Sequence, residues 1–194
     1  PYWVSYPEMI KLAEGVTVEI PTTEAQGFKV TAKQVEAAIT PKTKVFLFNS
    51  PNNPSGAVFS YEDLKGIAEV LKKYPNIYII SDEIYHGLVY EGKAHSILEF
   101  TDRAFVFNGF SKLYAMTGFR LGYVIAPKPF IRPMQKLQQN FFISANAMVQ
   151  KAGIAALKHA KPDVEKMRET YNQRRKYMIS HLKKMGFGIT VEPT

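Results

Sequence analysis

The sequence predicts an α/β protein in which helices cover a largely parallel sheet. Three observations favour this class: short apolar runs alternate with helical patterns, most of these runs are apolar on both faces, and polar loops follow several of them directly. The chain has 194 residues, which is enough for one hydrophobic core and the start of a second domain.

Five segments are expected to form strands, because each is a short run rich in β-branched or aromatic residues bounded by turn formers. They are Val16 to Ile20, Lys44 to Asn49, Ile77 to Ser81, Ala104 to Asn108 and Leu121 to Ala126. Four of them are nearly all apolar or aromatic. Both faces of these strands should therefore be buried.

Helices are expected between and after the strands. Thr31 caps a helix that runs to Ile39, and Ser60 caps a second one that runs to about Lys73. Prolines after Ala126 lead into a helical remainder. It ends in a long helix from Asp163 to Met185, which Gly186 is placed to terminate.

We expect two domains, a large one over residues 1–160 and, over 161–194, an interdomain helix with the start of a small C-terminal domain. Both ends resemble cuts through a longer protein. The first residue is Pro1, and Phe187 to Thr194 looks like a strand being entered. We therefore expect a large domain that is truncated at both ends.

The composition argues against several classes of protein. Hydrophobic residues make up 46% and charged residues 22%, and no apolar run is long enough to span a bilayer. There is no cysteine, and the four histidines lack ligand spacing, so a metal site is not expected.

Much of the net charge of +8 comes from the segment Lys158 to Lys184, which resembles a solvated helix face rather than a nucleic-acid surface. No secretory signal is evident, and we expect a cytoplasmic protein.

Two of the loops that follow predicted strands carry candidate site residues. The first runs from Asn49 to Gly56 and includes Asn53, and the second carries Asp82 with Tyr85 three residues later. Each loop could be only a turn or a helix cap. In parallel sheets, however, the loops after the carboxyl ends of the strands form the ligand crevice. The Asp82 carboxylate could bind a cationic ring nitrogen in this crevice. It could do so and also cap a helix, so the two interpretations are compatible.

A third candidate is Lys112, which follows the predicted strand Ala104 to Asn108 and precedes Arg120 by eight residues. A lysine at the end of a buried strand is partly desolvated, which makes its amine available for a Schiff base with an aldehyde. Glycines beside Arg120 let the backbone approach a ligand, and a guanidinium suits a phosphate. The alternative is a pair of ordinary surface cations. The combination suits an anionic ligand that bears an aldehyde.

On these residues the sequence resembles the class I and II aminotransferases, which are pyridoxal-phosphate enzymes of fold type I. The segment Ser111 to Tyr123 is similar to the cofactor-lysine segment of that family, and the resemblance covers essentially the whole chain. It is closest to the aspartate aminotransferase branch. The resemblance implies a three-layer α/β/α large domain with a mainly parallel sheet and pyridoxal 5′-phosphate (PLP) as the cofactor.

The resemblance also implies a role for each candidate. Lys112 would bind the cofactor aldehyde and then move the proton on the substrate Cα, and Asp82 would pair with the pyridinium nitrogen. Asn53 and Tyr85 would donate hydrogen bonds to the 3′ oxygen of the ring, and Arg120 would bind the phosphate.

Two further positions are implied by the same resemblance. Trp3 matches the aromatic residue that stacks near the ring or the substrate, although it could also be an exposed aromatic side chain at a strand end. Many relatives carry a serine three residues before the lysine, where this chain has Gly109. We therefore expect phosphate binding to depend on Ser111, on backbone amides or on residues elsewhere.

The implied activity is transfer of an amino group between an amino acid, with aspartate as the expected one, and a 2-oxo acid. The implied partner is a second copy of the same chain in a homodimer. A PLP-dependent β-lyase of carbon–sulfur bonds and another amino-acid aminotransferase share these motifs. An inactive isolated domain is the third alternative. The residues that choose the substrate are expected to lie outside this segment.

Overall fold

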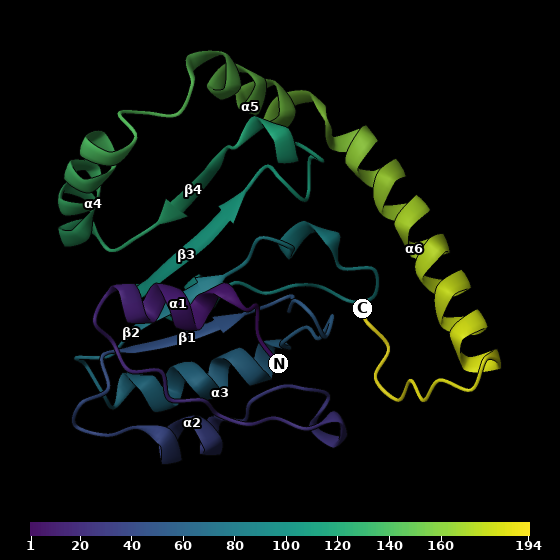
Figure 1. Ribbon diagram of the computed structural model, residues 1–194, viewed down its shortest axis with the longest axis horizontal. Helices are drawn as coiled ribbons and strands as arrows, with labels where there is room; N and C mark the ends of the chain where they lie inside the picture. Colours follow the sequence, from purple (N-terminus) through teal and green to yellow (C-terminus); the bar gives the residue numbers. More distant parts are fainter.

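The computed structural model describes residues 1–194, and all four strands lie in the first two thirds of the chain, with helices before and between them (Figure 1). No helix combines the length and apolar character needed to cross a membrane. The helices and strands are α1 (Ser5–Leu12), α2 (Ala32–Ala38), β1 (Val45–Asn49), α3 (Tyr61–Lys72), β2 (Tyr78–Asp82), β3 (Ala104–Gly109), β4 (Gly122–Ile125), α4 (Lys128–Phe141), α5 (Ala147–His159) and α6 (Lys161–Lys184).

The four strands form one sheet in the order β1-β2-β3-β4. The first three are parallel, and β4 runs antiparallel to β3. The expected mainly parallel sheet is therefore confirmed, and four of the five expected strands are present within one or two residues of the expected ends. The expectation that these strands are buried on both faces is wrong for β4, where Tyr123 and Ile125 are 47% and 48% exposed. It also fails at single positions of β1 and β3, where Val45 and Phe107 are 45% and 41% exposed.

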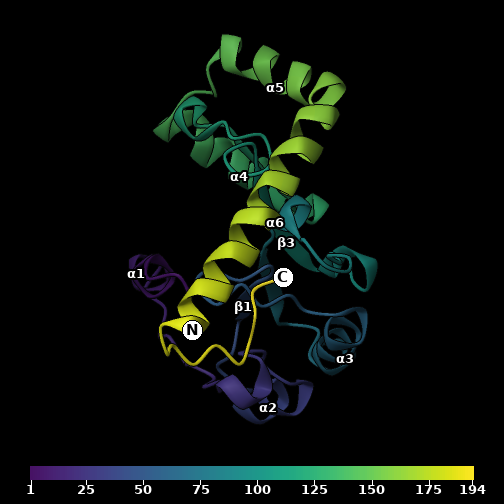
Figure 2. The same ribbon diagram turned by 90° about the vertical axis from the view of Figure 1, so that its right-hand side faces the viewer.

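Helices lie on both faces of the sheet, so the architecture has three layers. In the side view, α1 and α3 lie on opposite sides of β1 (Figure 2). On the α1 side, Phe130 of α4 packs its ring against Tyr78 of β2 and Phe105 of β3. The sheet is thus held between two layers of helices, as the sequence pattern predicts.

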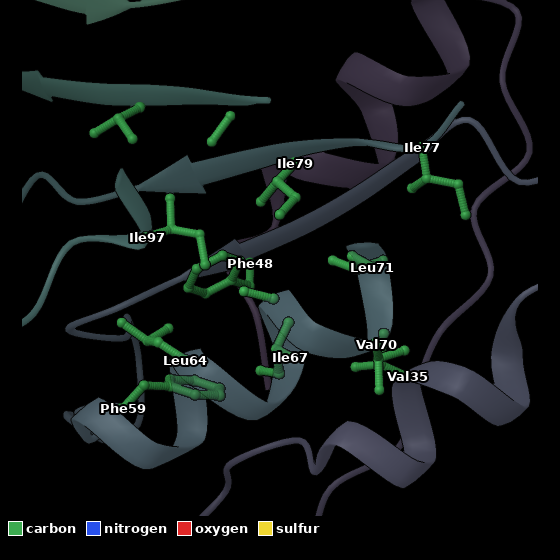
Figure 3. Close-up of a cluster of buried hydrophobic side chains, with 13 residues drawn as sticks. Val35, Phe48, Phe59, Leu64, Ile67, Val70, Leu71, Ile77, Ile79 and Ile97 are labelled. Carbon is green, nitrogen blue, oxygen red and sulfur yellow. The ribbon is translucent and has the colours of Figure 1, made fainter. Parts of the chain in front are cut away.

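The main hydrophobic core lies between α3 and the sheet. Leu64, Ile67 and Leu71 of α3 are almost completely buried, and they meet Ile79 of β2 and Val35 of α2 (Figure 3). The two helices begin at the caps that the sequence predicts, because Thr31 and Ser60 accept hydrogen bonds from backbone N–H groups in the first turn.

Two segments that were expected to be strands have no regular structure. Val16 to Ile20 lies outside the sheet, with Val16 and Val18 88% and 68% exposed, and only Ile20 packs against the core. The segment from Phe187 to Thr194 is also irregular. A β-branched run becomes a strand only where a neighbouring strand can pair with it, and neither segment lies in the sheet.

The last third of the chain is helical, as expected. Helix α6 forms a long arm that passes along one side of the molecule (Figure 1). Gly186 follows it with a φ of 90°, the left-handed conformation that terminates helices. The division into domains at residue 160 stays a prediction.

Candidate active site

The candidate residues lie where three parallel strands end. Asn49 and Asp82 are the last residues of β1 and β2 and are partners across the two strands. Asn53 lies in the loop after β1, and Lys112 lies in the turn after β3. The carboxyl ends of parallel strands share one edge of the sheet, so these loops gather there.

Asp82 is held in a fixed orientation by two hydrogen bonds. The hydroxyl of Tyr6 donates to Oδ2 at 2.7 Å, and the backbone N–H of Ile84 donates to Oδ1 at 3.1 Å. Together the two bonds fix both carboxylate oxygens in place. Burial, followed by the bond to Asp82, raises the pKa of Tyr6 well above its usual value, so its phenol stays a donor at neutral pH. The site therefore presents an oriented carboxylate.

Sequence reasoning missed Tyr6 as a member of the candidate site, and it gave Asn49 no role beyond its place at the start of the first candidate loop. The amide of Asn49 donates from Nδ2 to the Asp82 carbonyl at 2.8 Å, and its Oδ1 accepts the Asn53 N–H at 2.7 Å. Asn49 is 4% exposed, and a buried asparagine at a strand end usually has such partners. It joins the loop that carries Asn53 to the strand that carries Asp82.

Lys112 and Tyr85 lie close together. Nζ of Lys112 is 5.6 Å from the centre of the Tyr85 ring, and the lysine is partly buried. The turn that carries the lysine is closed by hydrogen bonds from Ala115 N to the Lys112 carbonyl and from Met116 N to the Phe110 carbonyl, each 3.2 Å. The amine is therefore presented from a compact turn beside a phenol.

The structure explains the glycine at position 109. A Cβ there would lie 3.0 Å from the Leu121 carbonyl oxygen and 3.1 Å from Gly122 Cα, both backbone atoms of the chain entering β4. A side chain there would require that backbone to shift by a few tenths of an ångström. With glycine at this position, the chain has no hydroxyl at 109 to contact a phosphate.

Trp3 lies beside this cluster, at the start of the chain. Its ring packs edge to face on Tyr6, with centroids 5.9 Å apart, and it is 43% exposed. The indole therefore lies next to the phenol that orients Asp82 and leaves part of its surface free.

Ser111 and Arg120 are less clearly joined to the cluster. Ser111 is partly buried next to the lysine. Arg120 is exposed, has a φ of 51°, and donates from its guanidinium to the Thr117 carbonyl at 2.8 Å. No hydrogen bond links either side chain to Asp82 or Asn53.

Glu83 follows Asp82 and stabilises the end of β2 from the opposite face of the sheet. Its Oε1 accepts hydrogen bonds from the hydroxyls of Ser81 and Ser96, each at 3.0 Å, and from Ile97 N–H at 3.1 Å. A cavity of about 390 Å³ borders Glu83 and His86. Side chains alternate between the faces of a strand, so Glu83 and Asp82 point to opposite faces. This cavity is therefore separate from the group formed by Tyr6, Asn53, Asp82, Tyr85 and Lys112, which we call the Asp82 cluster.

The chemistry of the Asp82 cluster fits PLP. It offers an amine for an aldehyde, a carboxylate for a cationic ring nitrogen, and an amide and a phenol for a ring oxygen, and Trp3 beside it adds an indole for a ring face. The hydrogen bond from Tyr6 fixes the orientation of the carboxylate.

The sequence model of the family described as aminotransferase class I and II matches residues 1–194. The chain is 42% identical over 189 residues to a putative aminotransferase, YugH, of Bacillus subtilis, covering 96% of this chain and 49% of that protein. It is 42% identical over 179 residues to an aspartate aminotransferase of Geobacillus stearothermophilus, covering 90% of this chain and 45% of that protein.

Solved structures agree with these matches. The aspartate aminotransferase of Thermus thermophilus, solved with maleate, superposes with a TM-score of 0.95 at 39% identity. The match covers 100% of this chain and 51% of that chain. The present chain thus spans about half the length of the curated relatives it matches.

Proposed function

Since the chain belongs to the class I and II aminotransferases, we propose that the whole protein is a PLP-dependent aminotransferase acting between an amino acid and a 2-oxo acid. We propose aspartate as the amino donor, because aspartate aminotransferases are among its relatives. The observation that carries the proposal is the geometry at the strand ends, where Lys112 lies beside Tyr85 and Tyr6 orients Asp82.

PLP, when bound, supplies an aldehyde and an electron-withdrawing ring. The Lys112 amine would bind the aldehyde and, once the amino substrate displaces it, would move the proton on the substrate Cα. Asp82 would hold the proton on the ring nitrogen, and the bond from Tyr6 would keep the carboxylate aligned for this task. Asn53 and Tyr85 would orient the ring through its 3′ oxygen.

The remaining cofactor contacts are proposed for Arg120, Ser111 and Trp3. Arg120 carries the forked donors that suit a phosphate, and in binding one it would exchange its bond to the Thr117 carbonyl. Ser111 is proposed as a second phosphate contact, because this chain has glycine at 109, where many relatives have a serine. Trp3 would cover one face of the ring or the substrate.

We further propose that the whole protein is a homodimer. Support comes from the junction of α4 and α5, where Phe141, Phe142 and Ile143 are 75%, 73% and 82% exposed. Three consecutive large apolar side chains in water are typical of a protein–protein interface. The cytoplasmic location stays a prediction.

The test of the activity is a substitution of the lysine in the full-length protein. Wild type mixed with PLP should show a visible absorbance band, and borohydride reduction should attach the cofactor covalently at Lys112. Lys112→Ala should lose both and should lower the transamination rate of aspartate with 2-oxoglutarate by about 100-fold to 10,000-fold, the usual contribution of acid–base catalysis.

Lys151→Ala is the matched control, because Lys151 is an exposed lysine on α5. It should retain the band and the rate. A Lys112→Ala protein that keeps the band would contradict the assignment of the lysine. Release of pyruvate and ammonia from cystathionine, with no transamination, would instead identify a β-lyase.

A further inference from the structure

Arg175 is a buried arginine in the middle of α6, a helix that is otherwise mostly exposed. Its side chain is only 7% exposed. It donates to the Pro193 carbonyl at 2.6 Å, forms an ion pair with Glu91, and contacts Asn172 Oδ1 through two of its nitrogens, at 2.9 and 3.1 Å. Its guanidinium also lies over the ring of Tyr90, with the central carbon 5.4 Å from the ring centre.

These contacts join three parts of the chain that are far apart in sequence. Figure 1 shows the C-terminal segment turning back from the end of α6 toward the sheet. There the Pro193 carbonyl meets Arg175, and the N–H of Thr194 donates to the Gly56 carbonyl at 3.4 Å. Gly56 has a φ of 71° and no room for a Cβ, because the Pro193 ring occupies that space.

Two of the Arg175 contacts each lead to a loop of the candidate site, the one with Glu91 directly and the one with Pro193 through its neighbour Gly56. Gly56 lies three residues after Asn53, and the hydrogen bonds from Gly56 N to the Asn52 carbonyl and from Ser55 to Asn52 Oδ1 make this loop compact. Tyr90 and Glu91 lie five and six residues after Tyr85, with one turn of 3₁₀ helix between them. The two loops carry the groups proposed for the 3′ oxygen of the ring.

Only an arginine can make this set of contacts. Its planar fork points five N–H donors in fixed directions, so it can bind a carbonyl, a carboxylate and an amide at once while its flat face covers an aromatic ring. A lysine at this position has a single ammonium group. It could reach Glu91 or Pro193, but it could not hold both in the same geometry.

We propose that Arg175 is a positioning residue of the site, which holds the Asn53 loop and the Tyr85 loop in place through Pro193 and Glu91. The inference rests on the proposed function, because it concerns the two side chains proposed to bind the ring oxygen. Hydrogen bonds donated to that oxygen would disfavour the protonated form of the nitrogen that joins Lys112 to the cofactor, and would so lower its pKa. If the two loops are loosened, these hydrogen bonds should weaken, and the pKa of that nitrogen should rise.

The experiment compares Arg175→Ala with Arg174→Ala in the full-length protein loaded with PLP. Arg174 is the neighbouring arginine on the same helix and is exposed, so it controls for loss of charge. Arg175→Ala should raise the pH midpoint of the visible absorbance band by about half a pH unit or more and should weaken PLP binding about tenfold. Arg174→Ala should leave both unchanged.

Two further variants keep the test decisive if Arg175→Ala does not fold. Arg175→Lys and Glu91→Gln each keep part of the contact, and each should move the midpoint in the same direction by a smaller amount. Variants that melt at a lower temperature but titrate like wild type would show a merely structural role and would overturn the inference. If wild type itself gives no visible band with PLP, the proposed function fails, and that outcome is distinct from an unshifted midpoint.

Discussion

Tyr6 illustrates how a single residue outside the predicted motifs can orient a group that is proposed to bind the cofactor. It comes from α1, 76 positions before the aspartate that it contacts. Because burial and the bond to Asp82 raise its pKa, the phenol remains a donor throughout the pH range of ordinary assays. The hydrogen bond that orients the carboxylate is therefore present throughout that range.

The Tyr6→Phe substitution tests this role. It removes one of the two donors to Asp82 and leaves the ring in place. A hydrogen bond to a charged group contributes about 1.5–3 kcal/mol, so PLP should bind about 10-fold to 100-fold more weakly. The measurement is a PLP titration of the full-length protein followed by its visible absorbance band.

Tyr2→Phe is the control for this titration. Tyr2 also donates to a carboxylate, that of Glu19, but both side chains are exposed. Its removal should leave the affinity for PLP unchanged. Equal affinities in the two variants would show that Tyr6 does not prepare Asp82 for the cofactor.

At the scale of one element, α3 shows why some helix ends can be read directly from the sequence. Ser60 Oγ accepts the N–H of Asp63, and Asp63 Oδ2 accepts the N–H of Ser60, so the cap closes within four residues. Such local bonds need no distant partner. Asp63 also pairs with Lys29 at 2.6 Å, and this contact is tertiary.

The charge of Asp63 should make the stability of this helix depend on pH. Partial burial opposes ionisation, but the bonds from Lys29 and Ser60 outweigh it and lower the pKa of Asp63. A lowered pKa in the folded state stabilises the protein above the unfolded value, near pH 4, and that stability is lost as the pH falls through the folded value.

Asp63→Asn tests this dependence, because asparagine keeps the cap but not the charge. Urea unfolding should show the variant about 1 kcal/mol less stable at pH 7, the size of one cap or surface ion pair. The difference should shrink as the pH falls through the lowered folded-state pKa of Asp63. Glu62→Gln, on the exposed side of the same turn, should show little change, and a pH-independent deficit in Asp63→Asn would contradict the argument.

In the sheet, unlike at the helix caps, the local sequence pattern is not sufficient to predict the structure. The run Val16 to Ile20 is as β-branched as a strand, yet it pairs with no other strand. Leu121 to Ala126 does form β4, but antiparallel and with exposed side chains. The direction of a strand and the burial of its faces depend on neighbours, and β-propensity does not specify them.

At the scale of the whole molecule, the proposed dimer makes a prediction about the junction of α4 and α5. If this junction is the interface, Phe142→Ser in the full-length protein should weaken self-association about 10-fold to 100-fold, because burial of one such side chain contributes about 1.5–3 kcal/mol. Light scattering after size-exclusion chromatography would measure this at several concentrations.

Phe187→Ser provides the comparison for this measurement. Phe187 is also a large exposed aromatic side chain, 57% accessible, but it lies just beyond the end of α6. Its removal should leave the association unchanged. A protein that is monomeric at every concentration, with both phenylalanines present, would refute the homodimer.

The chain's local patterns were sufficient to predict the α/β class, the caps at Thr31 and Ser60, the long last helix and the family to which Lys112 and its neighbours belong. These features depend on residues that are near one another in sequence. By contrast, a basic helix face gives no sign that Arg175 is buried while Arg174 is exposed. The bonds of Tyr6 and Asn49 to the Asp82 strand were equally hidden. Their partners lie tens of residues away, and only the packing of the whole chain brings them together.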